Sequence, residues 1–424
     1  MKKTAIFFPG QGPQYPGMGK MFYERSEAIK EIYAQASEVL QYDLARHSFE
    51  GSIDGITDTR YAQPAIVVAG YAAYRDYLEH IGPVGLPSFM AGHSMGEITA
   101  LLCAGALNFS DAVRLAVKRG ELMNRVAQDR GGAMAAIKDL FWKDTETICA
   151  QIPAEEGHVS VAAYNSDWQT VITGSAKAVE AAGLLCAGEG GIYMPLNIAV
   201  ASHCPFMQDI LAEFGEFVNS LGIQWPSTIV YSCMTGQQYR SVTEIRENIT
   251  GQLVHPVLWH KILKDIKRKD AGIYIEAGPG SALGKIIGGS EEIVISLEKW
   301  PVDKIRTTLG QQVRFIPTPV TKCLSLMISI PDRHDNPETY EDHFLQNYRK
   351  VQAIQDAIEA GERLPDIQEM QTAVKLMNEA CIAKGTPPQV MEALIRELLK
   401  EFPYAIDFFQ SYPLRSNLQY EEIV

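Results

Sequence analysis

The stretch "SFMAGHSMGEITALLCAGAL" (residues 88–107) contains the pattern that decides the fold. A short apolar run leads into "GHSMG" at residues 92–96, and an apolar helical pattern follows. At a tight strand-to-helix turn, small flanking residues let the backbones approach each other and leave the serine exposed. Ser94 is therefore a candidate nucleophile at a helix N-terminus, where the amide of Met95 can face a developing oxyanion. The alternative is a chance match in a glycine-rich protein.

Short apolar runs alternate with helical patterns on both sides of this stretch. Residues 4–8 ("TAIFF") read as a buried strand, and residues 64–80 have the period of a buried helix. Such alternation predicts an α/β core with a parallel sheet. Residues 132–205 differ, because several strand-like segments lie there with helices between them, as in a small α+β insertion.

The last part of the chain changes character again. After about residue 309 the pattern is helical, and Asp366 with Glu369 forms a capping box at the start of one expected helix. We therefore expect an α/β core over 1–131 and 206–309, an insertion over 132–205, and a helical extension over 310–424.

The bulk composition limits the function. The chain has 424 residues and a net charge of −13, so the field of the whole molecule disfavours nucleic acid and anionic membrane as partners. No apolar stretch approaches the length of a membrane span. The seven cysteines are scattered with no CxxC pair, which predicts reduced thiols in a cytoplasmic protein and no metal site.

A nucleophilic serine needs a base, and the chain offers nine histidines. His203 stands out because it follows the apolar run "NIAVAS", which we interpret as a strand that ends at the rim of a site. An esterase of the α/β-hydrolase type would have an acid and then a histidine near its C-terminus, and no such pair is evident. Residues 9–19 ("PGQGPQYPGMG") lack the Lys-Ser/Thr of a phosphate loop. Their glycines instead allow loop amides to approach a substrate closely.

With these pieces placed, the chain resembles the malonyl-CoA:acyl-carrier-protein transacylase family, in its stand-alone, trans-acting form. The resemblance covers residues 4–297, and its motifs occur in the family's order. They are "FFPGQGPQYPGMG", "YAQPAI", "AGHSMGEITALLCAGAL", "VKRGELM", "GAMAAI", "VAAYNSDWQTVITG", "VASHCPFM", "GQLVHPVLW" and "EAGPGSAL". The resemblance implies a hydrolase-like α/β core with an inserted ferredoxin-like subdomain. The extension over 310–424 matches no family that we recognise.

The resemblance also implies the catalytic groups. Ser94 matches the nucleophile that takes the acyl group, and His203 matches the base that deprotonates it. The family has a dyad in which a backbone carbonyl orients the histidine, and this carbonyl falls at Gln252. The amides of Gln11 and Met95 match the oxyanion hole.

The same resemblance implies the residues that bind the substrate. Arg119 matches the arginine that grips the free carboxylate of malonyl, which a planar guanidinium can do bidentately. Gln63 matches a recurrent pocket residue. Met95 is a selectivity position, and its apolar side chain favours malonyl over methylmalonyl. The other selectivity positions are the three residues before the histidine: Val200, Ala201 and Ser202.

The implied reaction is ping-pong transfer of malonyl from malonyl-CoA to the phosphopantetheine thiol of an acyl carrier protein, in fatty-acid or polyketide synthesis. It requires no bound metal or cofactor, and a polyketide synthase is a candidate partner. The basic run over 261–269 could contribute to a docking face for an acidic carrier protein, or it could be a solvated helix face.

Several alternatives remain open. The same fold could serve a hydrolase that clears acyl carrier proteins, a transferase for a branched extender such as methylmalonyl, or a carboxylesterase or lipase. A non-catalytic docking subunit built on the helical extension is a further alternative.

Overall fold

The computed structural model describes residues 3–81, 87–198, 200–287, 292–311, 318–330, 344–361 and 364–402. Its strands are β1 (Lys3–Phe8), β2 (Phe89–Gly92), β3 (Ala133–Lys138), β4 (Val159–Ser166), β5 (Gln169–Gly174), β6 (Ile192–Pro195), β7 (Ile229–Tyr231), β8 (Ala271–Glu276) and β9 (Ile293–Ser296). The chain divides into two compact units: Thr4–Asp76 with Phe89–Trp300, and Met1–Lys3 with Tyr77–Ser88 and Pro301–Val424.

Most helices belong to the first unit. They are α1 (Lys20–Arg25), α2 (Glu27–Leu40), α3 (Leu44–Glu50), α4 (Ile53–Thr57), α5 (Thr59–Ile81), α6 (Gly96–Cys103), α7 (Phe109–Arg130), α8 (Trp142–Gln151), η2 (Ala154–Glu156), α9 (Ala176–Gly188), η3 (Pro205–Ile210), α10 (Leu211–Ser220), α11 (Val242–Gly251), α12 (Trp259–Arg268) and α13 (Ala282–Ile287). The last residues of α5 belong to the second unit. No helix in the described ranges combines the length and apolar character needed to cross a membrane.

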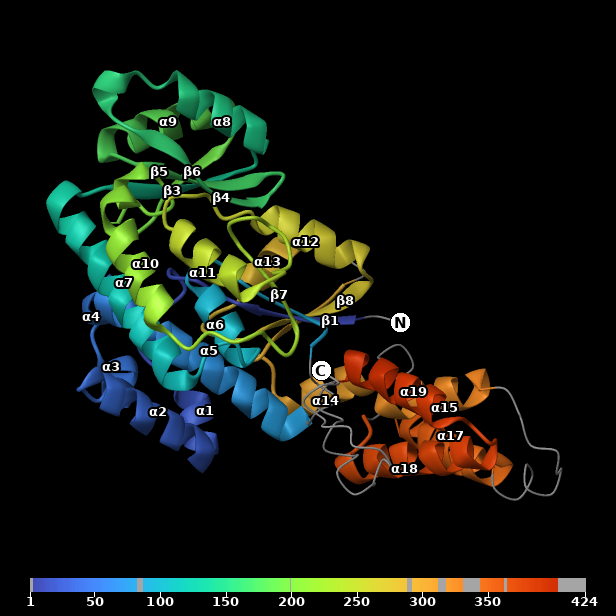
Figure 1. Cartoon of the computed structure of the whole chain (residues 1–424). Coiled ribbons are helices and arrows are strands. Elements are labelled where there is room, and N and C mark those ends of the chain that lie inside the picture. Colours follow the sequence, from blue (N-terminus) through green and yellow to red (C-terminus); the bar gives the residue numbers. More distant parts are fainter. Residues whose placement is uncertain are drawn as a thin grey trace. The chain divides into compact units, whose positions relative to one another are not determined.

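A five-stranded sheet of order β7-β2-β1-β8-β9 forms the centre of the first unit (Figure 1). The pairs β1–β2, β2–β7 and β8–β9 are parallel, as the strand–helix alternation predicts. All four residues of β2 are buried, which is why this strand reads as a continuous apolar run. Phe7 of β1 packs edge-on against Trp259 of α12, with ring centroids 5.0 Å apart.

The insertion contains its own sheet, a four-stranded sheet of order β4-β5-β3-β6 whose assigned pairs are antiparallel. Helices α8 and α9 cover one face of this sheet (Figure 1), and buried residues such as Ile137, Ile172 and Ala182 form its core. The core is therefore a hydrolase-like parallel sheet with an inserted ferredoxin-like subdomain. The exact limits of the insertion, 132–205, stay a prediction; its strands lie within 133–195.

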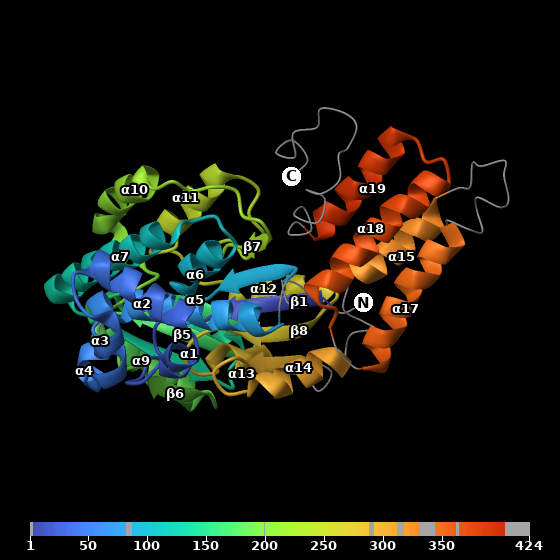
Figure 2. The same ribbon diagram turned by 90° about the horizontal axis from the view of Figure 1, so that it is seen from below.

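The second unit is helical. Its C-terminal part contains α14 (Val302–Gln311), α15 (Pro319–Ser329), α17 (Gln346–Ala360), α18 (Ile367–Ala383) and α19 (Pro388–Glu401). Helices α15, α17 and α18 lie side by side (Figure 2). The capping box at the start of α18 is confirmed, since the Asp366 side chain accepts from the Glu369 amide and Glu369 reaches back to the Asp366 amide. The sequence boundary at 309/310 stays a prediction, and α14 groups with these helices.

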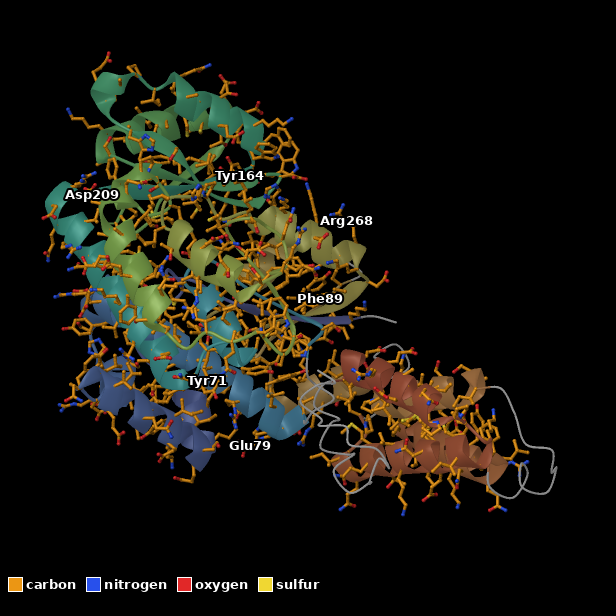
Figure 3. All side chains as sticks on the ribbon, in the orientation of Figure 1. Tyr71, Glu79, Phe89, Tyr164, Asp209 and Arg268 are labelled. Carbon is orange, nitrogen blue, oxygen red and sulfur yellow. The ribbon has the colours of Figure 1, made fainter. Side chains whose placement is uncertain are left out.

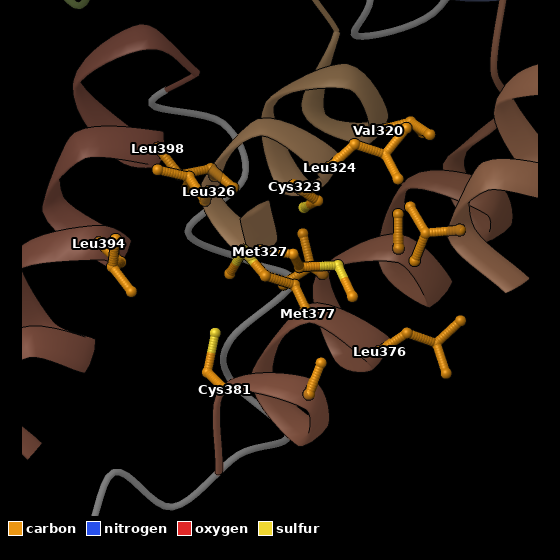
Figure 4. Packing of buried hydrophobic residues seen from close by; sticks show 14 of the residues in the cluster. Val320, Cys323, Leu324, Leu326, Met327, Leu376, Met377, Cys381, Leu394 and Leu398 are labelled. Carbon is orange, nitrogen blue, oxygen red and sulfur yellow. The ribbon is translucent and has the colours of Figure 1, made fainter. Parts of the chain in front are cut away.

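These helices share an apolar core of their own (Figure 4). Met327 of α15 and Met377 and Cys381 of α18 are fully buried in it, together with Leu398 of α19. Within the described residues of the extension, these helices therefore share one apolar core.

We expect Met377→Ala to destabilise the helical unit by about 2–5 kcal/mol, because it removes a fully buried side chain and leaves a cavity. Ile382→Ala is the matched control on the same helix, since Ile382 is 67% exposed and its truncation should change stability by less than about 0.5 kcal/mol. Hydrogen exchange of the α18 amides measures both. Equal protection in the two variants would contradict this core.

Candidate active site

Ser94 lies on a sharp turn between β2 and α6. Its φ is 52°, in the left-handed region that few residues other than glycine adopt. The flanking glycines have no room for a side chain: a Cβ on Gly92 would lie 1.9 Å from the carbonyl carbon of Gly96, and one on Gly96 would lie 2.1 Å from the Phe8 oxygen. This is the strand–turn–helix context that the pattern at 92–96 predicts.

The structure brings His203 to this serine. Ser94 Oγ lies 2.7 Å from His203 Nε2. His203 Nδ1 lies 2.7 Å from the backbone oxygen of Gln252 and 3.1 Å from that of His255. Because a carbonyl oxygen only accepts, Nδ1 carries the proton and Nε2 is left to accept from the serine hydroxyl.

Burial sets the charge state of this imidazole. His203 is 5% exposed, and its pKa is lowered to about 3, first by burial and then by the positive charge of Arg119. His203 is therefore neutral at neutral pH, which is the state that a general base needs.

His203 does not end a strand, contrary to the sequence interpretation. Strand β6 stops at Pro195, and His203 has a φ of 62° in an irregular segment. The segment is held by close packing instead: a Cβ on Gly132 would lie 2.6 Å from the Ala201 Cβ and 2.8 Å from its amide nitrogen. Apolar composition alone does not distinguish such a buried irregular segment from a strand.

Arg119 of α7 is a buried cation beside the serine. It is 2% exposed, and one of its terminal nitrogens donates to Ser94 Oγ over 3.0 Å. Burial lowers its pKa to about 10, so the guanidinium stays charged at neutral pH. In the described part of the chain its Nε has no hydrogen-bond partner.

Gln63 of α5 has a second unsatisfied polar atom. The residue is fully buried, its amide nitrogen lies 3.3 Å from the Met123 sulfur, and its Oε1 has no partner among the described residues. A buried polar atom left in this state is costly unless a ligand or water satisfies it.

Two backbone amides remain available near the serine. Within the described ranges, the amides of Gln11 and Met95 donate to no protein group. Gln11 lies on the glycine-rich loop after β1, and its side chain donates to Thr59 Oγ1 over 3.2 Å. The four residues that the resemblance implies as selectivity positions are buried: Met95, Val200, Ala201 and Ser202. Ser202 Oγ lies 3.5 Å from the Met134 sulfur.

Glu97 was not singled out from the sequence, although it is a lone carboxylate in the apolar helix "GEITALLC". The Glu97 side chain is fully buried. The Tyr239 hydroxyl donates to its Oε1, and the side-chain amide of Gln252 donates to its Oε2 over 3.2 Å. Its pKa is raised to about 7 by burial, partly offset by hydrogen bonds from Cys233 and Tyr239 and by the charge of Arg119.

The basic run over 261–269 is largely neutralised by neighbouring acidic groups. Lys264 pairs with Asp167 at 2.7 Å, and Lys267 pairs with Glu292 at 2.7 Å. Arg268, at the end of α12 (Figure 3), pairs with Asp265 at 2.9 Å. These pairs favour the solvated helix face over a free basic docking face.

The comparisons with known proteins decide the family. The family described as "Acyl transferase domain" matches residues 6–292, more than half of the chain. The chain belongs to the acyl transferase domain family. The match includes Ser94, Arg119, His203 and Gln252.

Among the relatives of this acyl transferase is a malonyl CoA-acyl carrier protein transacylase from Bacillus subtilis, 30% identical over 91% of this chain and 98% of the relative. That alignment leaves so little of the chain unmatched that it must include most of the helical extension. A second relative with the same name, from Haemophilus influenzae, is 36% identical over 70% of this chain and 96% of its own length.

Solved structures agree with the fold. The malonyl CoA-acyl carrier protein transacylase of Coxiella burnetii is 34% identical, with a TM-score of 0.67 over 70% of this chain and 94% of that one. A malonyl-transacylase solved in complex with its type II polyketide synthase acyl-carrier protein is 32% identical, with a TM-score of 0.66 over 70% of this chain and 96% of that one.

We expect Gly132→Ala to slow covalent labelling of Ser94 by a fluorophosphonate by up to about 100-fold, because a Cβ at residue 132 pushes on Ala201 and displaces His203. Gly188→Ala is the control, since a Cβ there meets no atom within 4 Å. Labelling is followed by intact-protein mass spectrometry. Equal rates for the two variants would show that the 132–201 contact does not position His203.

Proposed function

We propose that this acyl transferase moves a malonyl group from malonyl-CoA to the phosphopantetheine thiol of an acyl carrier protein, through an ester on Ser94. The observation that carries the proposal is the buried guanidinium of Arg119 next to Ser94 Oγ. Only one methylene separates the reacting carbonyl of malonyl from its free carboxylate. A fixed cation beside the nucleophile can therefore bind the free carboxylate of malonyl, whereas acetyl has no carboxylate for it to bind.

The dyad geometry supports the first half-reaction. His203 Nε2 takes the proton from Ser94 Oγ as the oxygen attacks the thioester carbonyl, and the Gln252 oxygen stabilises the imidazolium that forms. The free amides of Gln11 and Met95 receive the developing oxyanion. The imidazolium then returns the proton to the departing sulfur of coenzyme A.

The second half-reaction reverses these steps with a different thiol. His203 deprotonates the phosphopantetheine thiol, the thiolate attacks the malonyl ester, and Ser94 recovers its proton. Each step uses only groups of this chain and of the substrates, so we expect no bound metal or cofactor.

Arg119 also weighs against a hydrolase of the same fold, because water as acceptor of uncharged acyl chains needs no carboxylate clamp. Gln63, with its unsatisfied oxygen, is a further substrate-binding candidate. The selectivity positions Met95, Val200, Ala201 and Ser202 leave the choice between malonyl and methylmalonyl open, since one methyl group is worth only about 1–3 kcal/mol.

The partners follow from the relatives' names. Two relatives are named malonyl CoA-acyl carrier protein transacylase, and one solved neighbour holds a type II polyketide synthase carrier protein. An acyl carrier protein and a coenzyme A thioester are therefore the proposed partners, with a polyketide synthase as a further candidate.

We expect intact-protein mass spectrometry to show a malonyl adduct after mixing with malonyl-CoA, none in Ser94→Ala, and loss of the adduct on adding a phosphopantetheinylated acyl carrier protein. Methylmalonyl-CoA and acetyl-CoA are tested in parallel to identify the extender. Release of free acid from acyl thioesters without a stable adduct would favour the hydrolase. If neither an adduct nor turnover is observed, the docking subunit becomes the favoured alternative.

Arg119→Ala should lower the second-order rate of malonyl loading on the order of 10–100-fold, which corresponds to about 1.5–3 kcal/mol for lost charge-assisted hydrogen bonds. Acetyl loading should not fall in parallel. Arg125→Ala is the control on the same helix, because Arg125 is half exposed and pairs with Glu213. Unchanged malonyl loading in Arg119→Ala would contradict the assignment of Arg119 as the group that binds the malonyl carboxylate.

A further inference from the structure

A buried carboxylate lies one residue beyond the nucleophile turn and is not used in the reaction derived above. Glu97 follows Gly96 in α6, and its backbone amide donates to the backbone oxygen of Ser94 over 3.1 Å. Its side chain is fully buried, although no part of the proposed acyl transfer calls on it. Burying a carboxyl group costs folding free energy unless other groups hydrogen-bond to it. Its partners therefore indicate why it is placed there.

The partners of Glu97 lead back to the dyad. Gln252 donates its side-chain amide to Glu97 Oε2 over 3.2 Å, while the backbone oxygen of the same residue accepts from His203 Nδ1 over 2.7 Å. His203 Nε2 in turn contacts Ser94 Oγ at 2.7 Å. The contacts therefore form a closed ring: Ser94, His203, Gln252, Glu97 and back through the first turn of α6.

The outer side of the ring is also fixed. Tyr239 donates to Glu97 Oε1, and the Cys233 thiol lies 3.9 Å from the Gln252 side-chain oxygen. Gln252 directly follows helix α11 as its C-terminal cap. Its backbone amide donates to the Asn248 oxygen over 2.9 Å, and its backbone oxygen also accepts from the His255 amide over 3.4 Å. The side-chain contacts with Glu97 and Cys233 add to these backbone bonds in fixing the direction of the Gln252 carbonyl.

We propose that Glu97 is a positioning residue for His203, which acts by holding Gln252 so that its carbonyl fixes the tautomer and orientation of the imidazole. A carboxylate can accept from Gln252 and Tyr239 at once, whereas a neutral amide at this position has only one acceptor oxygen for the two donors. The charge also balances Arg119 and the imidazolium that forms during attack. The inference rests on the proposed Ser94–His203 chemistry but not on the identity of the acyl group.

Glu97→Gln tests this, because the change is isosteric. We expect the maximal rate of Ser94 acylation by malonyl-CoA to fall about 10–100-fold, as for other partners that orient functional imidazoles, with little change in the half-saturating concentration. Tyr239→Phe should have a smaller effect in the same direction. Glu121→Gln, the same charge change at an exposed site on α7, is the matched control and should behave as wild type.

A pH profile separates positioning from general structural support. The groups that face Glu97 are Arg119, Cys233, Tyr239 and Gln252, and burial raises the pKa of Glu97 to about 7. The wild-type loading rate should therefore rise as the pH passes through 7, while Glu97→Gln stays near the low-pH level. Loss of this inflection is not expected from a merely structural role.

Thermal stability gives an independent readout. The folded-state pKa of Glu97 lies above its ordinary value of 4.5, so the folded chain holds this proton more tightly than the unfolded chain. The Glu97 contribution is present at low pH and is lost as the pH rises through about 7. Glu97→Gln cannot ionise at this position, so its Tm should fall less than that of wild type as the pH rises from about 5 to 8. An equal fall in Tm for the two proteins over this range would overturn the proposal.

Fluorophosphonate labelling of Ser94 makes the test independent of the acyl donor. If malonyl does not load but Glu97→Gln still slows labelling relative to Glu121→Gln, the proposed substrate fails and the positioning role stands. If malonyl loads and Glu97→Gln matches wild type in loading and labelling, the positioning role fails alone. No labelling of wild-type Ser94 would overturn both.

Discussion

The close approach of backbones at residues 92–96 is the constraint on which the site depends. It leaves no space for a Cβ at Gly92 or Gly96, and it holds Ser94 in a left-handed conformation at the N-terminus of α6. The strain is tolerated because β2 is pinned between β1 and β7 in the buried parallel sheet. The same turn places Ser94 Oγ next to His203, leaves the Met95 amide without a backbone acceptor among the described residues and buries Glu97, so one backbone feature positions three groups to which we assign roles.

His203, like Ser94, depends on an unusual backbone conformation, but as the base it must stay neutral until it takes a proton. It also has a left-handed backbone, but it lies on an irregular segment that packs closely against Gly132. Its Nδ1 faces carbonyl oxygens rather than a carboxylate, so no charge directly offsets the imidazolium. The buried carboxyl group of Glu97 is connected to His203 through Gln252. Burial and the positive charge of Arg119 keep the resting imidazole neutral, while Glu97, whose pKa burial raises to about 7, titrates in the same buried network.

Sequence patterns predicted local structure, whereas the grouping of Ser94 with His203 and Gln252 came only from the family resemblance. Short apolar runs identify β1 and β2, and the glycines identify the turn at Ser94, because each signal lies within a few residues. The run before His203 has the composition of a strand but is irregular, and it packs closely on Gly132, which lies about 70 residues earlier in the chain. Glu97 is visible as a lone charge in an apolar helix, yet its partners Tyr239 and Gln252 are 142 and 155 residues away. Periodicity carries no information on such pairings.

The charges of the site also link substrate binding to base strength. In the free protein, the positive charge of Arg119 is one of the causes that lower the pKa of His203. In the proposed reaction the malonyl carboxylate binds this guanidinium, and the pair is close to neutral as seen from the imidazole. The pKa of His203 then rises, so His203 becomes a stronger base when the charged acyl group is in place. An acetyl group brings no such charge and leaves Arg119 uncompensated. In the proposed reaction the cation beside Ser94 therefore acts on malonyl selection in two ways, by direct contact with the carboxylate and through the basicity of His203.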